Sequence, residues 1–259
     1  CLSQGHNVLY ITLEMAEEKI AERIDANLLN IDMQELHVIP RTDYERKFEV
    51  LRSKTHGKLI IKEYPTASAS VLHFRSLINE LQLKKSFRPD IIFVDYLNIC
   101  ASSRIKPGAS VNSYSYIKAI AEELRGLAVE YAVPVISATQ TTRSGYSNSD
   151  VDLTDTSESF GLPATADFMF ALIATEELND LNQIMVKQLK NRYNSPDTNK
   201  RFVIGVDRGK MKLYDAEASA QSDISDSGQV QQQDDKPMFD KSSFGNRMKS
   251  ERKFSGFKT

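Results

Sequence analysis

Short apolar runs alternate with amphipathic stretches over most of the chain. Apolar runs of strand length cover residues 7–13, 58–63, 91–94 and 134–138. Between them, apolar positions recur at helical spacing over residues 16–29, 70–83 and 113–131, and a further helix is predicted over 43–56, where Gly57 closes it. Continuous apolar runs suit strands that are buried on both faces. Their alternation with helices predicts an α/β fold with a mainly parallel central sheet and helices on both faces.

Two of these helices carry a well-defined apolar stripe that should pack on the sheet. In residues 70–83 the inward positions are Leu72, Leu77, Ile78 and Leu81. In residues 113–131 the stripe consists of Ile117, Ile120, Ala121, Leu124, Leu127 and Ala128. The polar residues Lys118, Glu122, Glu123 and Arg125 fall outside that stripe.

The pattern changes in the second half of the chain. Residues 141–159 are rich in Ser, Thr and Asp, and a polar stretch of this length is typical of a functional or mobile loop. Further strands are predicted at residues 168–174, 184–189, 201–206 and 210–214, and the middle two form a hairpin around Asn194 to Asp197. From Asp215 the chain has little apolar content, which predicts a domain over residues 1–214 and a disordered tail over 215–259.

Composition narrows the class of protein. The net charge of −2 gives no global signal for nucleic acid, so any such site must be local. Two cysteines, Cys1 and Cys100, cannot form a disulfide framework or a cysteine metal cluster, which favours a reducing cytoplasm. No apolar run approaches the roughly 18 residues of a membrane span. Because the chain starts at Cys1 and enters a strand without a signal pattern, we expect it to be a fragment that has lost its N-terminus.

Polar residues follow three of the predicted strands: Glu14, Asp95 and Gln140. The carboxyl ends of parallel strands meet at one edge of the sheet, where α/β folds bind their ligands. Asp95 by itself fits either a Walker B ligand to Mg²⁺ or a residue that caps a loop. Taken together, the three residues favour a nucleotide site with a metal carboxylate and a group that positions water.

A phosphate-binding loop of the form G-x-x-x-x-G-K-[ST] is absent from the 259 residues. The nearest string, residues 205–211, has the wrong spacing, lacks the hydroxyl that binds the metal, and lies between two predicted strands. Either the protein does not hydrolyse nucleotides, or its phosphate loop lies upstream of Cys1.

Several cations could contact phosphate. Lys190 and Arg192 lie two residues apart on the same side of a predicted strand. Such a pair can reach a phosphate from a neighbouring subunit, or it can simply protect a solvated strand edge. Arg143, and Arg104 with Lys106, lie in polar loops and either contact a nucleic-acid backbone or are solvated.

Several strings occur together in a fixed order. They are residues 10–15 (YITLEM), 91–97 (IIFVDYL), 134–140 (PVISATQ), 155–159 (DTSES) with 166–167, 190–192 (KNR), and the helix 120–128 (IAEELRGLA). In this order and spacing, residues 5–214 resemble the C-terminal RecA-like motor domain of DnaB-family replicative helicases, in the version found in T-even-type bacteriophages. The resemblance implies a RecA-like P-loop NTPase fold.

The resemblance also implies residue roles in ATP hydrolysis. Glu14 would polarise the attacking water, and Asp95 would hold Mg²⁺ through water. Gln140 would link the state of the γ-phosphate to the DNA-binding loop that follows it. Lys190 and Arg192 would act in trans on the nucleotide of the next subunit.

Single-stranded DNA would lie near Arg143, Glu158 and Ser159 in a central channel. This sequence departs from the family pattern at two positions that bear on the phosphate contact and on the shape of this turn. Ser157 stands where the family has a DNA-contacting arginine, and Phe160 stands where a glycine is usual.

The implied function is that of a hexameric, ATP-dependent helicase that moves 5′ to 3′ on single-stranded DNA and hydrolyses ATP or another NTP with Mg²⁺ at subunit interfaces. The implied partners are primase and a helicase loader in the bacterial cytoplasm, with no membrane. Residues 241–259 of the tail are basic and include scattered phenylalanines, so they are a candidate docking site for one of these partners. Without a phosphate loop, these residues alone should be inactive. A RecA- or RadA-type recombinase and a non-catalytic RecA-like scaffold are the alternatives.

Overall fold

The structure is a computed structural model. It describes residues 1–105, 111–141, 153, 161–195, 200–217 and 220–221. All of them belong to one compact unit, Cys1–Ile224. The predictions for Lys106, Arg143, Glu158 and Ser159, and for nearly all of the loop 141–159 and the tail 215–259, fall outside the described residues and stay predictions.

A four-stranded parallel sheet is formed by the first half of the chain. Its strands are β1 (Val8–Thr12), β2 (Leu59–Glu63), β3 (Ile91–Asp95) and β4 (Val135–Ser137). They lie in the order β2-β1-β3-β4, and every neighbouring pair is parallel. Each strand falls inside or within a residue of the apolar run that predicted it.

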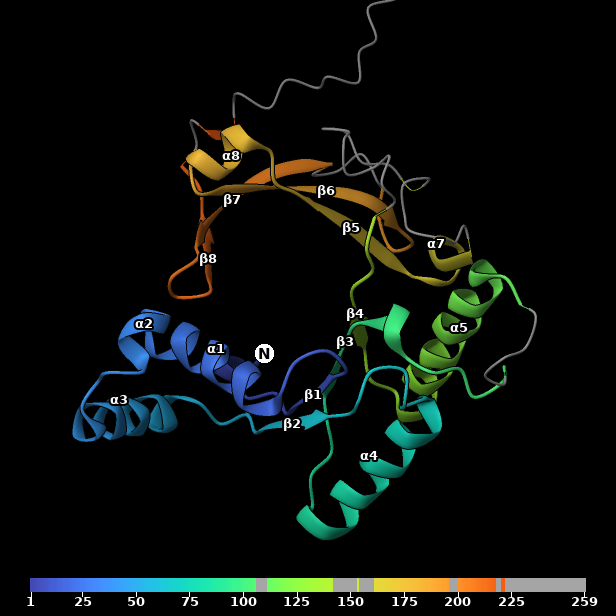
Figure 1. Cartoon of the computed structure of the whole chain (residues 1–259), viewed down its shortest axis with the longest axis horizontal. Coiled ribbons are helices and arrows are strands. Elements are labelled where there is room, and N and C mark those ends of the chain that lie inside the picture. The colour runs from blue at the N-terminus through green and yellow to red at the C-terminus, as the bar shows by residue number, and fades with distance from the viewer. Residues whose placement is uncertain (106–110, 142–152, 154–160, 196–199, 218–219, 222–259) are drawn as a thin grey trace, which may run out of the picture. The chain divides into compact units, whose positions relative to one another are not determined.

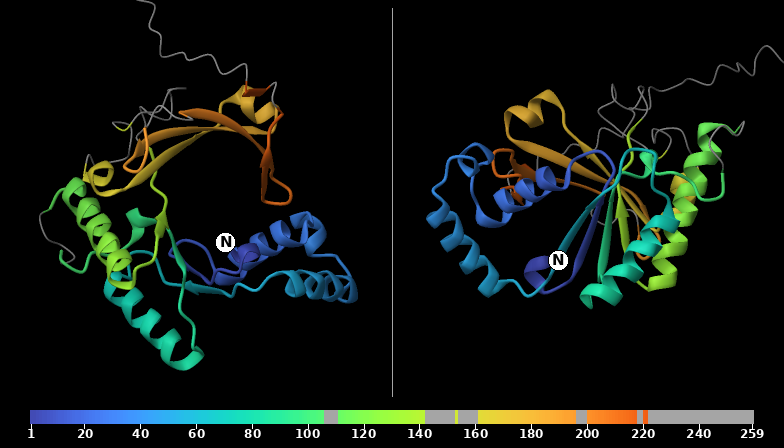
Figure 2. Two further views of the ribbon diagram at one scale, coloured as in Figure 1. Left: turned by 180° about the vertical axis from the view of Figure 1, so that it is seen from behind. Right: turned by 60° about the horizontal axis from the view of Figure 1, so that its bottom comes forward.

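Helices cover both faces of this sheet, as predicted. The helices on the sheet are α1 (Glu17–Leu29), α4 (Val71–Lys85) and α5 (Ser113–Tyr131), while α2 (Met33–Leu36) and α3 (Arg41–Lys54) lie beside α1. The step from β1 to β2 crosses the sheet in the opposite direction from the steps β2 to β3 and β3 to β4. Since such connections are right-handed, α1 lies on one face and α4 and α5 lie on the other (Figures 1 and 2).

The main hydrophobic core lies between the sheet and the helices α4 and α5. Leu9, Ile11 and Ile92 of the strands are completely buried there. Phe74 of α4 and Leu127 of α5 are also completely buried and belong to the same cluster. Burial of a side chain of this size contributes about 1.5–3 kcal/mol, so this face holds the sheet and its carboxyl edge rigidly in place.

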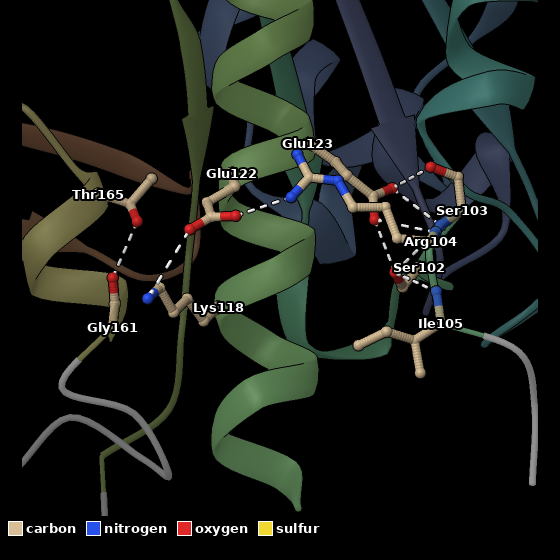
Figure 3. A network of polar contacts seen from close by, with 9 residues as sticks. All are labelled: Ser102, Ser103, Arg104, Ile105, Lys118, Glu122, Glu123, Gly161 and Thr165. Atoms are coloured by element: carbon tan, nitrogen blue, oxygen red, sulfur yellow. Dashed lines mark hydrogen bonds and ion pairs between the residues drawn. The ribbon is translucent and has the colours of Figure 1, made fainter. Parts of the chain in front are cut away.

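Two helix predictions are wrong at single positions. Leu72 is 53% exposed, because at 100° per residue it lies on the opposite side of α4 from Phe74 and Leu81. Glu123 is only 6% exposed although it falls outside the apolar stripe of α5. Its carboxylate is buried because Ser102 and Ser103 donate hydrogen bonds to it (Figure 3).

A prediction about β4 is also wrong, since this strand is not fully buried. Ile136 at its centre is 44% exposed. β4 lies at one end of the parallel sheet, and among the described residues its only strand neighbour is β3. Ile136 faces away from the side that α5 covers, because Val135 next to it packs against the main core.

A separate antiparallel sheet is formed by the second half of the chain. It contains β5 (Phe168–Ile173), β6 (Gln183–Asn191), β7 (Arg201–Asp207) and β8 (Lys212–Asp215) in the order β5-β6-β7-β8. The predicted hairpin and last strand are therefore confirmed. The short helices α7 (Gly161–Thr165) and α8 (Glu176–Asp180) flank β5 and were not predicted. Short 3-10 helices cover Leu2–Gln4 (η1) and Leu97–Ile99 (η2).

Within the described part of the chain, no helix combines the length and the apolar character needed to cross a membrane.

Candidate functional site

Three strand ends converge at the carboxyl edge of the parallel sheet. Thr12 and Asp95 are opposite each other in the β1–β3 register, and the backbone N–H of Leu13 donates to the carbonyl oxygen of Asp95 at 2.9 Å. Beyond β4, the side-chain Nε2 of Gln140 donates to the hydroxyl of Tyr96 at 3.1 Å. The structure therefore places Glu14, Asp95 and Gln140 at the ends of adjacent strands, in the arrangement that the sequence predicts.

The turn that carries Glu14 is fixed by a buried threonine. Thr12 is completely buried, and its hydroxyl donates to the carbonyl oxygen of Met15 at 2.8 Å and accepts from the backbone N–H of Met15 at 3.0 Å. The hydroxyl of Thr66 donates to the carbonyl oxygen of Leu13 at 2.7 Å. Glu14 itself is exposed, so its carboxylate is presented to solvent from a rigid turn.

Sequence reasoning missed the supporting role of Thr12. The available signal was a hydroxyl residue inside an otherwise apolar run, two positions before an acid. A buried threonine in such a place needs a hydrogen-bond partner, and the nearest backbone groups are those of the turn that follows.

The side chain of Asp95 is held by an aromatic residue on the neighbouring strand. The hydroxyl of Tyr10 donates to Oδ2 of Asp95 at 3.0 Å, and the Tyr10 ring stacks on Phe93 with 6.1 Å between centroids. Burial raises the pKa of Tyr10, and the negative charge of Asp95 raises it further. Tyr10 therefore stays a neutral donor at physiological pH and fixes the rotamer of the carboxylate.

The donor set at this edge fits Mg²⁺ bound together with a phosphate. Among the described residues there is no group of three or more His, Cys, Asp and Glu that could hold a metal by itself. Mg²⁺ is usually bound by one or two carboxylates plus phosphate oxygens and water, and a single Asp95 meets that need. Within the described residues, the hydroxyl of Thr139, which precedes Gln140 in the sequence, is buried and has no hydrogen-bond partner, so it can still bond a polar ligand.

Lys190 and Arg192 lie together at a different place, at the end of β6. Nζ of Lys190 donates to the carbonyl oxygens of Pro163 and Ala164. Nη2 of Arg192 donates to the carbonyl oxygen of Ala164 at 2.7 Å, so both cations reach the C-terminal end of α7. Burial lowers the pKa of Lys190, and the nearby charge of Arg192 lowers it further.

Asp167 connects this pair to α5. Its Oδ1 accepts from Nη1 of Arg192 at 2.7 Å, and its Oδ2 accepts from Nη1 of Arg125 at 2.7 Å. The hydrogen bond from Arg125 lowers the pKa of the Asp167 carboxyl, and the one from Arg192 lowers it further, although burial acts in the opposite direction. We call Arg125, Asp167, Lys190 and Arg192 the arginine cluster.

The structure thus forms two groups of candidate residues. One is the strand-end group of Glu14, Asp95 and Gln140, and the other is the pair Lys190 and Arg192. Within the described ranges, no hydrogen bond or ion pair joins the two groups. An arrangement of this kind suits residues that act on different nucleotides or on different subunits.

Comparison with known proteins gives a consistent result. A family described as "DnaB-like helicase C terminal domain" matches residues 1–209. The chain is 50% identical over 219 residues to a "DnaB-like replicative helicase" of Enterobacteria phage T4, covering 83% of this chain and 46% of that protein. It therefore spans about half the length of this relative.

Two solved structures share the fold. One is described as "The Structure Of A DnaB-Like Replicative Helicase And Its Interactions With Primase", with a TM-score of 0.66, 20% sequence identity, and coverage of 83% of this chain and 52% of that one. The other, "ATPase Domain of G40P", has a TM-score of 0.67, 19% identity, and coverage of 83% and 76%. At these identities the likeness supports the RecA-like α/β fold.

Proposed function

The chain belongs to the DnaB-like helicase C-terminal domain family, and from this premise we propose that it is the motor domain of an ATP-dependent replicative DNA helicase. Its subunits form a hexameric ring that moves 5′ to 3′ on single-stranded DNA and hydrolyses ATP, or another NTP, at subunit interfaces. Primase and a helicase loader are the proposed partners, and the bacterial cytoplasm is the proposed location.

The observation that carries this proposal is the convergence of Glu14, Asp95 and Gln140 at one sheet edge. Phosphoryl transfer needs a carboxylate that holds the metal, a group that orients the attacking water, and a positively charged side chain that contacts the transferred phosphoryl group. When bound at Asp95, Mg²⁺ would supply charge neutralisation to the phosphates. Glu14 orients and polarises water from its rigid turn.

The positive charge comes from Lys190 and Arg192 of the next subunit. This assignment is supported by the partners of Lys190 and Arg192 within one chain, which among the described residues lie on α7 and Asp167 and not in the strand-end group. Gln140, which is hydrogen-bonded to Tyr96, couples the presence of the γ-phosphate to the position of the loop that follows it. Binding of ATP also requires a phosphate loop, and these 259 residues contain no G-x-x-x-x-G-K-[ST]. We therefore expect the 259 residues alone to be inactive.

A complementation experiment tests the arrangement across subunits. The protein is expressed from its whole reading frame as Glu14→Gln, as Arg192→Ala, and as a mixture of the two variants. An arginine that reaches the phosphate from the next subunit, an arginine finger, contributes about 10³–10⁵ in kcat, so Arg192→Ala alone should lose DNA-stimulated ATP hydrolysis. Glu14→Gln alone should lose it too, because Glu14 is the group proposed to polarise the attacking water. In mixed rings, interfaces that join an intact Glu14 to an intact Arg192 should recover activity.

Two substitutions serve as controls. Glu18→Gln changes an exposed acid on the neighbouring helix α1, and Arg88→Ala changes an exposed cation before β3, at the opposite end of the sheet. Both should retain normal hydrolysis. If the mixture of inactive variants stays inactive, Arg192 does not act in trans. If Arg192→Ala alone hydrolyses ATP normally, the finger assignment is wrong.

A further inference from the structure

The guanidinium group of Arg192 contacts residues of its own subunit. Both terminal nitrogens of the guanidinium are engaged, Nη1 with Oδ1 of Asp167 at 2.7 Å and Nη2 with the carbonyl oxygen of Ala164 at 2.7 Å. A guanidinium uses the same N–H groups to bind phosphate. In this conformation one N–H of each terminal nitrogen is used within the same subunit, so a phosphate competes with Asp167 and Ala164 for the position of the guanidinium.

Asp167 is shared between two arginines that come from different elements. Arg125 projects from α5 and donates from Nη1 both to Oδ2 of Asp167 at 2.7 Å and to the carbonyl oxygen of Thr165 at 3.0 Å. Arg192 follows directly after β6. Each carboxylate oxygen of Asp167 thus accepts a hydrogen bond from one arginine. The strength of the hydrogen bond to Arg192 therefore depends on whether Arg125 is present.

We propose that Asp167 is a positioning residue that holds Arg192 back on its own subunit, and that phosphate on the neighbouring subunit binds Arg192 by displacing this carboxylate. Arg125 sets the strength of the competition, because it draws part of the charge of Asp167 to itself. This inference rests on the proposed action of Arg192 across the subunit interface.

The charge and the exposure of the arginine cluster keep the free-energy cost of replacing Asp167 by phosphate small. The arginine cluster has three cations, Arg125, Lys190 and Arg192, and one carboxylate, so an incoming phosphate meets a local excess of positive charge. The side chains of Arg192 and Asp167 are 41% and 33% exposed. Pairs this accessible to water are weak, so a phosphate anion can compete with Asp167.

The test measures ATP hydrolysis against ATP concentration with single-stranded DNA, using the protein from its whole reading frame. Asp167→Asn removes the competing charge and should lower the KM for ATP by about twofold to fivefold, the range expected for a partly exposed ion pair. Arg125→Gln leaves Arg192 as the remaining arginine on Asp167 and should raise the KM. The double variant should behave like Asp167→Asn, and Asp167→Glu should restore the KM.

The opposite changes in KM expected for Asp167→Asn and Arg125→Gln distinguish a positioning role of Asp167 from a structural one. Loss of a merely structural ion pair would move both single variants in the same direction, chiefly in kcat, and that result would overturn the proposal. The matched control is Glu130→Gln, which breaks a similarly exposed pair with Arg75, 2.7 Å apart, between α4 and α5 and should leave the KM unchanged. Added salt should shrink the shift caused by Asp167→Asn.

Failure here is distinguishable from failure of the proposed function. Normal hydrolysis by Arg192→Ala would contradict the finger itself. An inactive Arg192→Ala together with an unchanged KM in Asp167→Asn would refute only the role of Asp167.

Discussion

At the scale of single residues, Glu123 shows how a carboxylate stays ionised inside the protein. Its Oε1 accepts from the hydroxyl of Ser102 at 2.6 Å, and its Oε2 accepts from the hydroxyl and backbone N–H of Ser103 at 2.6 and 2.8 Å (Figure 3). Burial raises the pKa of Glu123, but these donors outweigh it and hold the pKa below the ordinary value of 4.5. The residues that follow η2 are thereby tied to α5.

We predict that Glu123→Gln lowers the free energy of unfolding by about 2–4 kcal/mol at pH 7, because charge-assisted hydrogen bonds are lost and an amide N–H faces other donors. Urea denaturation measures the change. The control is Glu122→Gln, whose exposed pairs with Arg104 and Lys118 should be worth less than about 1 kcal/mol. Equal losses in the two variants would contradict the prediction.

The same contacts predict a pH dependence. Because the pKa of Glu123 is lower in the folded than in the unfolded protein, its contribution is present above the unfolded pKa, near 4.5, and is lost as pH falls through the folded pKa. The difference in unfolding free energy between wild type and Glu123→Gln should therefore shrink as pH falls below 4.5. A difference that is constant from pH 7 to pH 3 would show that the charge of Glu123 is not involved.

At the scale of elements, the turn between β7 and β8 docks on the start of α2. The backbone N–H of Met33 donates to the carbonyl oxygen of Gly209 at 2.9 Å. Asp32 caps α2 by accepting from the N–H of Gln34 at 2.8 Å, and a Cβ at position 209 would lie 2.0 Å from Oδ2 of the same aspartate. A side chain at position 209 would therefore force the Asp32 carboxylate to move from its capping position.

We predict that Gly209→Ala destabilises the protein by about 1–2 kcal/mol, the value of a helix N-cap, because the methyl group displaces Asp32. Asp32→Ala should cost a similar amount, and the double variant should cost less than the sum. Gly126→Ala is the control: no atom lies within 4 Å of its added Cβ, and in the middle of α5 it should stabilise by about 0.5–1 kcal/mol. Thermal unfolding of the four variants checks this, and strict additivity would contradict it.

The longer elements were predictable because their apolar periodicity is a local property. The strands β1 to β8 and the helices α1, α4 and α5 all fall on runs that show it, and α3 was predicted from the glycine that follows it. The helices α2, α7 and α8 have only four or five residues, too few to display a helical period. The division into two hydrogen-bonded sheets depends on pairing between distant strands, which periodicity does not report.

Some features of the candidate site could likewise be predicted from the sequence, whereas others depend on contacts between distant residues. Convergence of Glu14, Asp95 and Gln140 follows from their positions at or shortly after strand ends, which the sequence displays. The bond between Tyr10 and Asp95 spans 85 residues, and the contact between Arg125 and Asp167 spans 42. Contacts of this kind are set by strand register and helix docking, so they became visible only in the folded protein.

At the scale of the whole molecule, one face of the antiparallel sheet leaves large apolar side chains in solvent. Phe168, Phe170 and Leu172 alternate along β5, so they share a face, and they are 48%, 50% and 61% exposed. Leu172 pairs with Val186, which pairs with Phe202, and Phe202 is 39% exposed. Adjacent exposed apolar side chains of this kind form a patch that favours association.

We predict that the 259-residue chain binds the dye ANS and self-associates through this face. The double variant Phe170→Thr, Leu172→Thr should lower ANS fluorescence and shift sedimentation toward the monomer. Threonine keeps a high strand propensity and the positions are half exposed, so the free energy of unfolding should fall by only about 1 kcal/mol. Leu83→Thr on α4, which is 85% exposed and distant from β5 in sequence, is the control and should leave both signals unchanged. If the double variant keeps the ANS signal and the association of the wild type, the exposed face of β5 is not the surface responsible.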